Sequence, residues 1–365
     1  MKFLIRVPNW LGDSVMSLPF FEALHRFFPY SQVDIIAKES IQALYAYHPA
    51  IARIHLFHKS RLKGLFGGFS YGRTLQAQHC YDVFFTLAPS FSSAFIGFGV
   101  GCRYRIGYRH EARSILLTHS IAPRADLLRA QLYYDLLVHF CRVVQADLRW
   151  SDKDIPKELP AFSEYRCSAL RLPFSEEEKQ SRFLTKHPDT EYILFNVNSE
   201  AQSRRLPAEK WIELGKRFLD NPRQKRCVVF SGSPVERLRV KAITDAISRP
   251  EGILDYSGKT TLRELALLLR DVDLVLSNDS GPMHLANAVG TPLLTWLGAA
   301  DPASTSPFNS EKTLVLNRLL DCSPCVKNVC RFPTVRCLEQ ISVDEIYDSA
   351  LSLLRISPNK SRTTA

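Results

Sequence analysis

Polar residues that could hold an anion are concentrated in one short segment, residues 278–284, NDSGPMH. An apolar run precedes this segment and a helical pattern follows it, so it is predicted to be a strand-to-helix turn. The first backbone N–H groups of such a helix can bind pyrophosphate, and Ser280 and Gly281 would lie beside them. His284 lies about one turn into the helix and could reach the same anion. The alternative is that Asp279 or Ser280 only caps the helix and that His284 is structural.

Two further turns carry groups suited to a phosphorylated nucleotide. The segment 198–207, NSEAQSRRLP, holds Arg204 and Arg205, whose guanidinium groups can each offer paired hydrogen-bond donors to a phosphate. In the turn 231–236, SGSPVE, Glu236 could accept hydrogen bonds from ribose hydroxyls. The alternatives are a solvated basic loop for the arginines and, for Glu236, a carboxylate that only favours a helix N-terminus.

An acidic residue that could act as a general base lies near the N-terminus. Asp13 ends the turn 8–13, PNWLGD, which follows the first apolar run. Its carboxylate could accept a proton from a substrate hydroxyl. Together with Ser14 it also stands where a helix N-cap belongs, so capping alone would account for it.

Two other groups of residues resemble metal sites. Asp271 and Asp273 precede a predicted strand, so we interpret them as ordinary polar residues between a helix and a strand. Four cysteines have the spacing C-x2-C-x4-C-x6-C, but the second close pair that is usual in zinc sites is missing. They could hold structural zinc or be reduced thiols packed in a C-terminal loop. These are Cys322, Cys325, Cys330 and Cys337.

The elements that must position these turns alternate between strand and helix. Apolar runs followed by amphipathic helical patterns are typical of parallel sheets, which bind ligands beyond the carboxyl ends of their strands. The predicted strands are 3–7, 33–37, 83–87 and 115–117 in the first half and 193–197, 227–231, 274–277 and 292–297 in the second. The predicted helices are 14–28, 127–144, 210–218, 236–247, 261–269 and 283–289.

The length of 365 residues predicts two domains. A stretch rich in charge and proline separates the two alternating halves and is typical of an interdomain connection. We place an N-terminal α/β domain at 1–165, the connection at 166–190, a C-terminal α/β domain at 191–350, and a tail at 351–365.

Composition restricts the classes of function. The chain has 45% hydrophobic and 23% charged residues, which is typical of a globular protein, and its net charge of +10 favours an anionic partner. No apolar run approaches the ~20 residues of a membrane span, and no signal peptide is visible, so we expect a cytoplasmic protein. No nucleic-acid-binding motif is present, and neither is a glycine motif of nicotinamide enzymes or P-loop ATPases. We therefore expect no nucleic-acid partner.

Several segments together resemble the lipopolysaccharide heptosyltransferases, glycosyltransferase family 9, and most closely the heptosyltransferase II type. The resemblance is carried by RVPNWLGDSVMSLPFFEAL, SGKTTLRELA, SNDSGPMHLANAVGTPLLTWLG and the later CSPC. It implies an α/β, GT-B architecture, with a Rossmann-like acceptor-binding domain at 1–165, a Rossmann-like ADP-sugar-binding domain at 191–350 and an active site in the cleft between them. It also implies an inverting, metal-independent enzyme without a cofactor. Such an enzyme moves L-glycero-D-manno-heptose from ADP-heptose onto the inner core of lipopolysaccharide, here the second heptose onto heptosyl-Kdo-lipid A.

The same resemblance assigns roles to individual residues. Asp13 matches the general base, and the block 279–284 matches the donor-binding block through Asp279, Ser280, Gly281 and His284. Glu236 matches the carboxylate that holds the ribose, and Lys259 and Thr260 lie in the loop expected near the adenosine. Where family members commonly have Lys-Arg-Trp-Pro, this chain has Arg204-Arg205-Leu206-Pro207, so Arg204 replaces the lysine expected at the donor phosphate.

Basic residues of the first half are suited to an anionic acceptor. Lys59, Arg61, Lys63 and Arg73 surround the segment GLFGGFSYG, which we interpret as a loop, and Arg105 follows. We predict that they bind the lipid A-core acceptor and rest on the cytoplasmic face of the inner membrane as peripheral contacts. A solvated basic surface is the alternative. For the whole chain, the alternatives are a GT-B transferase with a different nucleotide sugar or acceptor and a non-catalytic nucleotide-sugar-binding protein.

Overall fold

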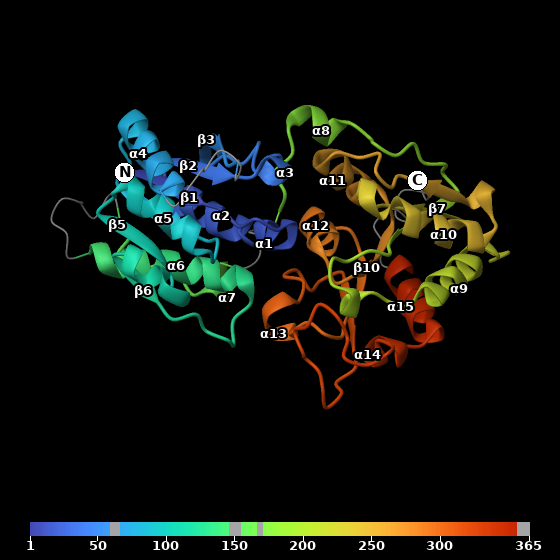
Figure 1. The fold of residues 1–365 in the computed structure, drawn as a ribbon. Coiled ribbons are helices and arrows are strands. Elements are labelled where there is room, and N and C mark those ends of the chain that lie inside the picture. Colours follow the sequence, from blue (N-terminus) through green and yellow to red (C-terminus); the bar gives the residue numbers. More distant parts are fainter. Residues whose placement is uncertain (59–65, 146–154, 166–170, 356–365) are drawn as a thin grey trace. The chain divides into compact units, whose positions relative to one another are not determined.

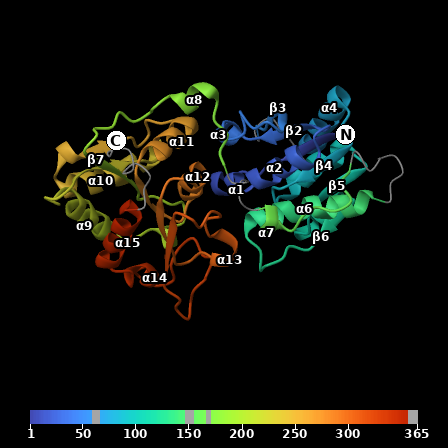
Figure 2. The same cartoon turned by 180° about the vertical axis from the view of Figure 1, so that it is seen from behind.

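The computed structural model describes residues 1–58, 66–145, 155–165 and 171–355. The chain divides into two units, Met1–Pro173 and Phe174–Ala365, which are shown from opposite sides in Figures 1 and 2. Each unit contains one six-stranded parallel sheet with helices packed against it. Within the described residues, no helix is both long enough and apolar enough to cross a membrane.

The sheet of the first unit has the order β3-β2-β1-β4-β5-β6. The chain therefore moves outward from β1 in one direction and then returns to start again beside it at β4. Ligands of such sheets bind at this reversal, beyond the carboxyl ends of the strands. The strands are β1 (Lys2–Arg6), β2 (Gln32–Ala37), β3 (Ile51–Leu56), β4 (Val83–Thr86), β5 (Tyr104–Tyr108) and β6 (His119–Ile121).

Helices cover both faces of this first sheet, because successive side chains of a strand point to opposite faces. In β4, Phe84 meets one face and lies against Gly97, whereas Phe85 contacts Phe20 and Phe140, with ring centroids 5.2 and 5.5 Å away. The helices are α1 (Leu11–Met16), α2 (Leu18–Phe27), α3 (Glu39–Gln42), α4 (Gly67–His79), α5 (Phe91–Val100), α6 (Arg129–Val144) and α7 (Phe162–Tyr165).

Two predictions for the first unit are wrong. Residues 115–117 are not a strand: a 3-10 helix, Glu111–Leu116, precedes β6. The buried guanidinium of Arg113 donates hydrogen bonds to the carbonyls of Tyr108 and Ala88, which holds this segment in a tight turn. The segment GLFGGFSYG is also not simply a loop, since α4 begins at Gly67.

The glycines of this segment allow α4 and α5 to touch through their backbones. A methyl group on Gly72 would overlap the carbonyl oxygen of Ile96, and one on Gly99 would overlap that of Phe69. We therefore expect Gly72→Ala to lower the free energy of unfolding by about 1–3 kcal/mol, because the two helices must separate. Urea denaturation measures this change. Gly68→Ala is the matched control on the same helix, because its methyl group would meet Phe95 at an ordinary 3.5 Å.

The second unit repeats this architecture with the sheet order β12-β11-β10-β7-β8-β9. Here the reversal lies between β7 and β10, which pair in parallel from Leu274 opposite Ile193 to Ser277 opposite Asn196. The strands are β7 (Thr190–Asn196), β8 (Lys225–Phe230), β9 (Ile253–Asp255), β10 (Leu274–Asn278), β11 (Leu293–Leu297) and β12 (Thr313–Asn317).

An aromatic core joins the helices of the second unit to its sheet. Trp211 lies between Phe195 and Trp296, with ring centroids 5.0 and 5.2 Å away. The α-helices are α8 (Glu176–Gln180), α9 (Ala208–Leu219), α10 (Arg237–Ile247), α11 (Leu262–Asp271), α12 (Gly281–Val289), α13 (Pro302–Thr305), α14 (Arg336–Glu339) and α15 (Val343–Arg355). Short 3-10 helices cover Gln202–Arg204, Pro234–Glu236 and Pro250–Gly252.

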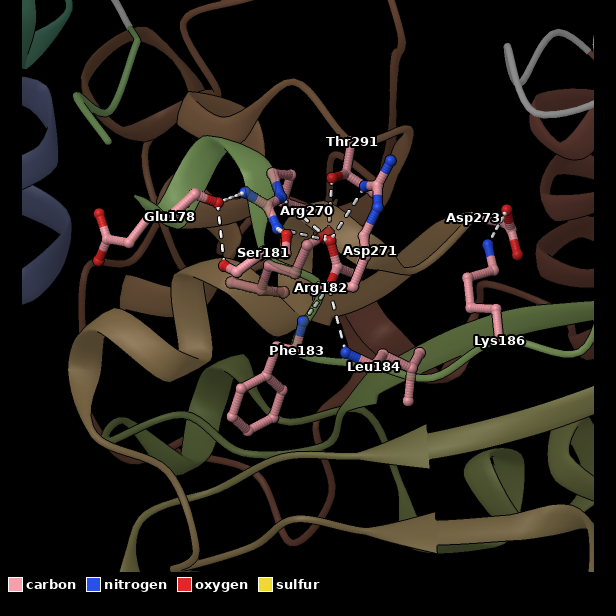
Figure 3. Close-up of polar contacts among 11 residues, drawn as sticks. Glu178, Ser181, Arg182, Phe183, Leu184, Lys186, Arg270, Asp271, Asp273 and Thr291 are labelled. Carbon is pink, nitrogen blue, oxygen red and sulfur yellow. Dashed lines mark hydrogen bonds and ion pairs between the residues drawn. The ribbon is translucent and has the colours of Figure 1, made fainter. Parts of the chain in front are cut away.

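Two aspartates just before β10 hold residues 182–186 against the rest of the second unit (Figure 3). Asp271 accepts hydrogen bonds from the backbone N–H groups of Phe183 and Leu184, at 2.6 and 3.1 Å, and forms ion pairs with Arg182 and Arg270. Asp273 accepts a 2.6 Å hydrogen bond from Lys186. The interpretation of these aspartates as structural polar residues between a helix and a strand is confirmed.

Candidate functional site

A buried arginine stabilises the turn that follows β1. The guanidinium of Arg6 donates hydrogen bonds to the carbonyls of Val7 and Ile36, at 2.6 and 3.1 Å, and to the side chain of Asn9. Burial lowers the pKa of Arg6 to about 10, but the group remains charged at neutral pH. These contacts fix the point at which the chain leaves the sheet and enters α1.

Asp13 lies in the first turn of α1 rather than at its cap. The N-cap position is Trp10, which makes no side-chain capping hydrogen bond, so the capping interpretation of Asp13 is wrong. The Asp13 carboxylate forms an ion pair with Nε of Arg129, 3.6 Å away, at the start of α6. Its side chain is 28% exposed. The structure therefore presents a partly exposed carboxylate at the strand reversal of the first unit. Sequence reasoning missed its partner Arg129, which lies 116 positions further along the chain.

The predicted acceptor residues divide into two groups. Lys59, Arg61 and Lys63 lie outside the described residues. Arg105 is half-buried and donates hydrogen bonds to the carbonyls of Leu116 and Cys102, at 2.9 and 2.7 Å. These contacts tie β5 to the neighbouring 3-10 segment. An acceptor role for Arg105 stays a prediction.

In the second unit, a buried amide joins two of the predicted turns. The side-chain oxygen of Asn278 accepts hydrogen bonds from the backbone N–H of Leu206, at 3.0 Å, and from the indole N–H of Trp296, at 2.8 Å. Ser199 donates a 2.9 Å hydrogen bond to the carbonyl of Asp279. The turn with the two arginines is therefore fixed against the end of β10.

The N-terminus of α12 is not capped by either candidate side chain. Ser280 occupies the N-cap position, but its hydroxyl donates to the carbonyl of Asn278 and accepts from Asn196 instead of capping the helix. Asp279 forms an ion pair with Arg204, with Oδ2 3.2 Å from Nη1. The capping alternative is therefore wrong for both residues, and the first N–H groups of α12 keep their capacity to bind an anion.

Burial and the charge of Arg204 determine the protonation states of Asp279 and His284. Burial raises the pKa of Asp279 to about 6, although the charge of Arg204 opposes the rise. Burial, together with the smaller effect of the Arg204 charge, lowers the pKa of His284 to about 4. At neutral pH the group therefore consists of a cationic guanidinium, a largely ionised carboxylate and a neutral imidazole. His284 can hydrogen-bond to an anion here but brings no positive charge.

Buried polar atoms without a hydrogen-bond partner gather at the carboxyl ends of β9, β8, β7 and β10. Folded proteins leave few such atoms, and each one calls for an explanation such as a ligand or water. Four adjacent strand ends together provide unpaired donors and acceptors that a bound polar molecule could satisfy. The atoms are Ser257 Oγ, Ser231 Oγ, Asn198 Oδ1, Asn278 Nδ2, Arg204 Nε and His284 Nδ1.

This arrangement can be compared with known proteins. Residues 69–336 match the model of glycosyltransferase family 9 (heptosyltransferase). The chain belongs to this family. It is therefore a glycosyltransferase, and its two parallel six-stranded units form the GT-B fold.

Individual relatives within the family match nearly the whole chain. Lipooligosaccharide heptosyltransferase 2 of Haemophilus influenzae is 28% identical over 324 residues, 86% of this chain and 88% of the relative. Lipopolysaccharide heptosyltransferase 2 of Escherichia coli K12 is 24% identical over 332 residues, 86% and 88% of the two chains. The solved structure of E. coli ADP-heptose LPS heptosyltransferase II has a TM-score of 0.74 and 23% identity, with 97% of this chain and 99% of that chain covered.

The remaining donor residues predicted for this family-9 chain lie on two neighbouring loops. The carboxylate of Glu236 accepts hydrogen bonds from the backbone N–H and the hydroxyl of Ser233, at 2.7 and 2.8 Å, which is the local capping role that the sequence left open. Lys259 is exposed and donates a 2.7 Å hydrogen bond to the carbonyl of Asp255. Gly258 links the loops through a 2.7 Å hydrogen bond to Gly232, and the half-buried Thr260 follows. Ribose and adenosine contacts stay predictions.

The cysteine cluster does not form a recognisable metal site in the described part of the chain. Cys330 donates a 3.3 Å hydrogen bond to the carbonyl of Thr334, and Cys337 is buried beneath Gly298. Among the described residues, no group of three or more His, Cys, Asp or Glu side chains could hold a metal ion. The zinc hypothesis for Cys322, Cys325, Cys330 and Cys337 gains no support from this geometry.

The buried imidazole predicts a pH dependence of stability. Folded His284 takes up a proton only near pH 4, whereas the unfolded chain does so near 6.5, so its contribution to stability falls as the pH drops through this window. Asp279 acts in the opposite sense, because its raised pKa makes its contribution fall as the pH rises. On acidification, the free energy of unfolding should therefore fall less for His284→Gln than for the wild type, by up to about 3 kcal/mol. Urea unfolding at neutral and mildly acidic pH measures this difference.

His48 provides the matched control. It lies in the first unit, and its pKa is also lowered to about 4 by burial and by His25. On acidification, the free energy of unfolding of His48→Gln should rise relative to the wild type by a similar amount. Only His284→Gln should weaken ADP binding at neutral pH. Equal loss of ADP binding in both variants would contradict a donor-site position for His284.

Proposed function

We propose that this chain transfers L-glycero-D-manno-heptose from ADP-heptose onto the inner core of lipopolysaccharide, with inversion and without a metal ion. The proposed acceptor is heptosyl-Kdo-lipid A, which receives the second heptose. Membership of family 9 and the names of the heptosyltransferase 2 relatives support this choice of donor and acceptor.

One observation carries the proposal for the donor. The unpaired buried atoms at four adjacent strand ends lie with the uncapped N-terminus of α12 and with Arg204. A diphosphate matches the helix N-terminus and the guanidinium, because both favour negative charge. A nucleoside matches the hydroxyl and amide groups that follow β7, β8 and β9. We assign the diphosphate to Ser280, Gly281, Arg204 and His284, and the nucleoside to the loops of Glu236 and Lys259–Thr260.

Asp13 is the proposed general base. The acceptor hydroxyl gives its proton to the Asp13 carboxylate while its oxygen forms a bond to the anomeric carbon. The bond from that carbon to the diphosphate breaks, and its electron pair leaves with ADP. Arg204 and the N-terminus of α12 stabilise the negative charge that develops on the departing diphosphate. Because base and leaving-group site belong to different units, the reaction requires the two bound substrates to meet.

We assign the anionic acceptor to the first unit. Lys59, Arg61, Lys63 and Arg105 are the proposed partners of its phosphates and carboxylates. The acceptor is anchored in the inner membrane by its lipid, so the enzyme would work as a peripheral protein at the cytoplasmic face.

A donor panel tests this function. The purified protein is incubated with the acceptor heptosyl-Kdo-lipid A and one donor at a time: ADP-heptose, a UDP-sugar or a GDP-sugar. The masses of the products are measured by mass spectrometry. Addition of one heptose from ADP-heptose alone supports the proposal. The second candidate, a transferase with another donor, is favoured by Arg204 at the position where family members commonly have lysine, and turnover of a different nucleotide sugar would establish it.

The structure of the lipopolysaccharide core in a strain that lacks this protein identifies the reaction step independently. In a strain that lacks this protein, lipopolysaccharide cores should end after the first heptose. An unchanged core would contradict the proposed acceptor, and truncation at another sugar would assign the enzyme to that step instead.

A further inference from the structure

Helices α4 and α5 lie next to each other in the first unit (Figure 1). Five phenylalanine side chains, from the N-cap of α4, from α4 itself and from α5, form a continuous aromatic surface there. Along α5, Phe91, Phe95 and Phe98 follow one another at helical spacing, with ring centroids 6.0 and 6.3 Å apart. Phe69 lies 6.0 Å from Phe95 and 5.8 Å from Phe98, and Phe66 lies 6.3 Å from Phe95. We call these five residues the phenylalanine patch.

The patch faces solvent. Phe66 is 71% exposed, Phe91 42% and Phe98 41%. Helix α5 is therefore apolar on both sides, because its opposite side packs on the sheet through Ala94, Ile96 and other buried residues. A surface helix normally has one apolar and one polar face, and a contiguous exposed aromatic surface indicates a partner.

The charge around the patch indicates which partner. Neither α4 nor α5 contains an acidic residue, and the described residues 66–110 include four basic residues against one acidic residue, Asp82. Asp82 accepts a hydrogen bond from the backbone N–H of Lys2. Arg73 is exposed one helical turn after Phe69, and the guanidinium of Arg105 lies 5.6 Å from the ring centroid of Phe98. An aromatic surface bordered by cations complements an anionic lipid surface.

We propose that the phenylalanine patch inserts into the interfacial region of an anionic lipid bilayer. The ten residues of α5 are far too short to span a membrane, so the helix would lie in the plane of the surface. Backbone contact between α4 and α5 at Gly72 and Gly99 holds the aromatic rings as one rigid face. The inference deepens the peripheral contact in the proposed function, and it rests on that function only for the identity of the lipid-linked acceptor.

Vesicle sedimentation tests the patch. The triple variant Phe66→Ser, Phe91→Ser, Phe98→Ser should bind phosphatidylcholine vesicles containing phosphatidylglycerol at least about tenfold more weakly than the wild type. The control variant Tyr30→Ser, Leu319→Ser removes two other strongly exposed side chains and should bind as the wild type does. Arg73→Ser should weaken binding only when phosphatidylglycerol is present and only at low salt.

The remaining measurements distinguish failure of the proposed membrane contact from failure of the proposed heptosyl transfer. Thermal unfolding and circular dichroism of the triple variant should match those of the wild type, which shows that the first unit, where the patch lies, remains folded. Vesicle binding by the triple variant equal to that of the wild type would overturn the inference, even if heptosyl transfer is intact. A wild-type dimer in light scattering that the triple variant converts to a monomer would also overturn it and assign the patch to a second copy of the chain. Loss of vesicle binding by the variant, in a protein without heptosyl transfer, would support the patch and refute the function.

Discussion

Asp13→Asn should lower heptosyl transfer by about 10²- to 10⁴-fold, because an amide of the same shape cannot accept the proton of the acceptor hydroxyl. The substitution keeps the size of the side chain and removes only its charge and basicity. ADP binding should be unchanged, since the proposed donor residues all lie in the second unit. Single-turnover transfer and calorimetric ADP titration measure the two quantities separately.

Asp126→Asn is the matched control for this substitution. Asp126 is also an acidic residue of the first unit that pairs with an arginine, Arg124 at 2.7 Å, but its side chain is 66% exposed. This variant should transfer heptose as the wild type does. Near-normal transfer by Asp13→Asn would show that another group accepts the proton. Loss of ADP binding together with transfer would indicate a folding defect, which thermal unfolding would reveal.

Arg204→Met should lower kcat/KM for the donor by about 10²- to 10³-fold, the usual effect of removing one group that stabilises developing negative charge. The guanidinium lies 3.2 Å from Asp279 and is the cation that opposes protonation of this carboxylate. Without it, the pKa of Asp279 should rise further and the site should lose both a phosphate partner and its charge balance. ADP affinity and transfer rate should fall together.

Two neighbouring substitutions control for this effect. Arg205→Met removes an adjacent guanidinium that donates hydrogen bonds to the carbonyls of Ser199 and Glu200, at 2.6 and 3.3 Å, so it should lower stability more than ADP affinity. Arg204→Lys keeps the charge and should lose less activity than Arg204→Met, although its ammonium group cannot offer paired donors. Equal loss of ADP affinity in Arg204→Met and Arg205→Met would contradict a specific phosphate contact.

The turns that hold the proposed chemistry could be located from sequence because local patterns define them. The apolar β1 and β10 are each followed by polar residues and then by a helical pattern, and these features depend only on neighbouring positions. Placement of Asp13 and of Asp279–His284 at strand ends follows from the same patterns. The aspartates at 271 and 273 were correctly interpreted as structural because they precede a strand.

Contacts between distant segments could not be predicted in this way. The β-rich residues 115–117 form no strand, because the tight turn before them is held by the buried Arg113, whose partners include Ala88 on another part of the chain. The glycines at 67–72 indicated a loop, but they serve the approach of two helix backbones. No local pattern reports which helix lies opposite a glycine.

The amino-acid sequence by itself therefore determined the fold class, the strand-to-helix turns and the family, because each depends on residue types at short spacing. Only the tertiary structure decided how the polar groups are paired. It placed Arg129 beside Asp13 and Arg204 beside Asp279, left Ser257 and Asn198 with unpaired buried atoms, and exposed the phenylalanine patch. Pairing and burial depend on which residues distant in the chain share a neighbourhood, and that is set by packing.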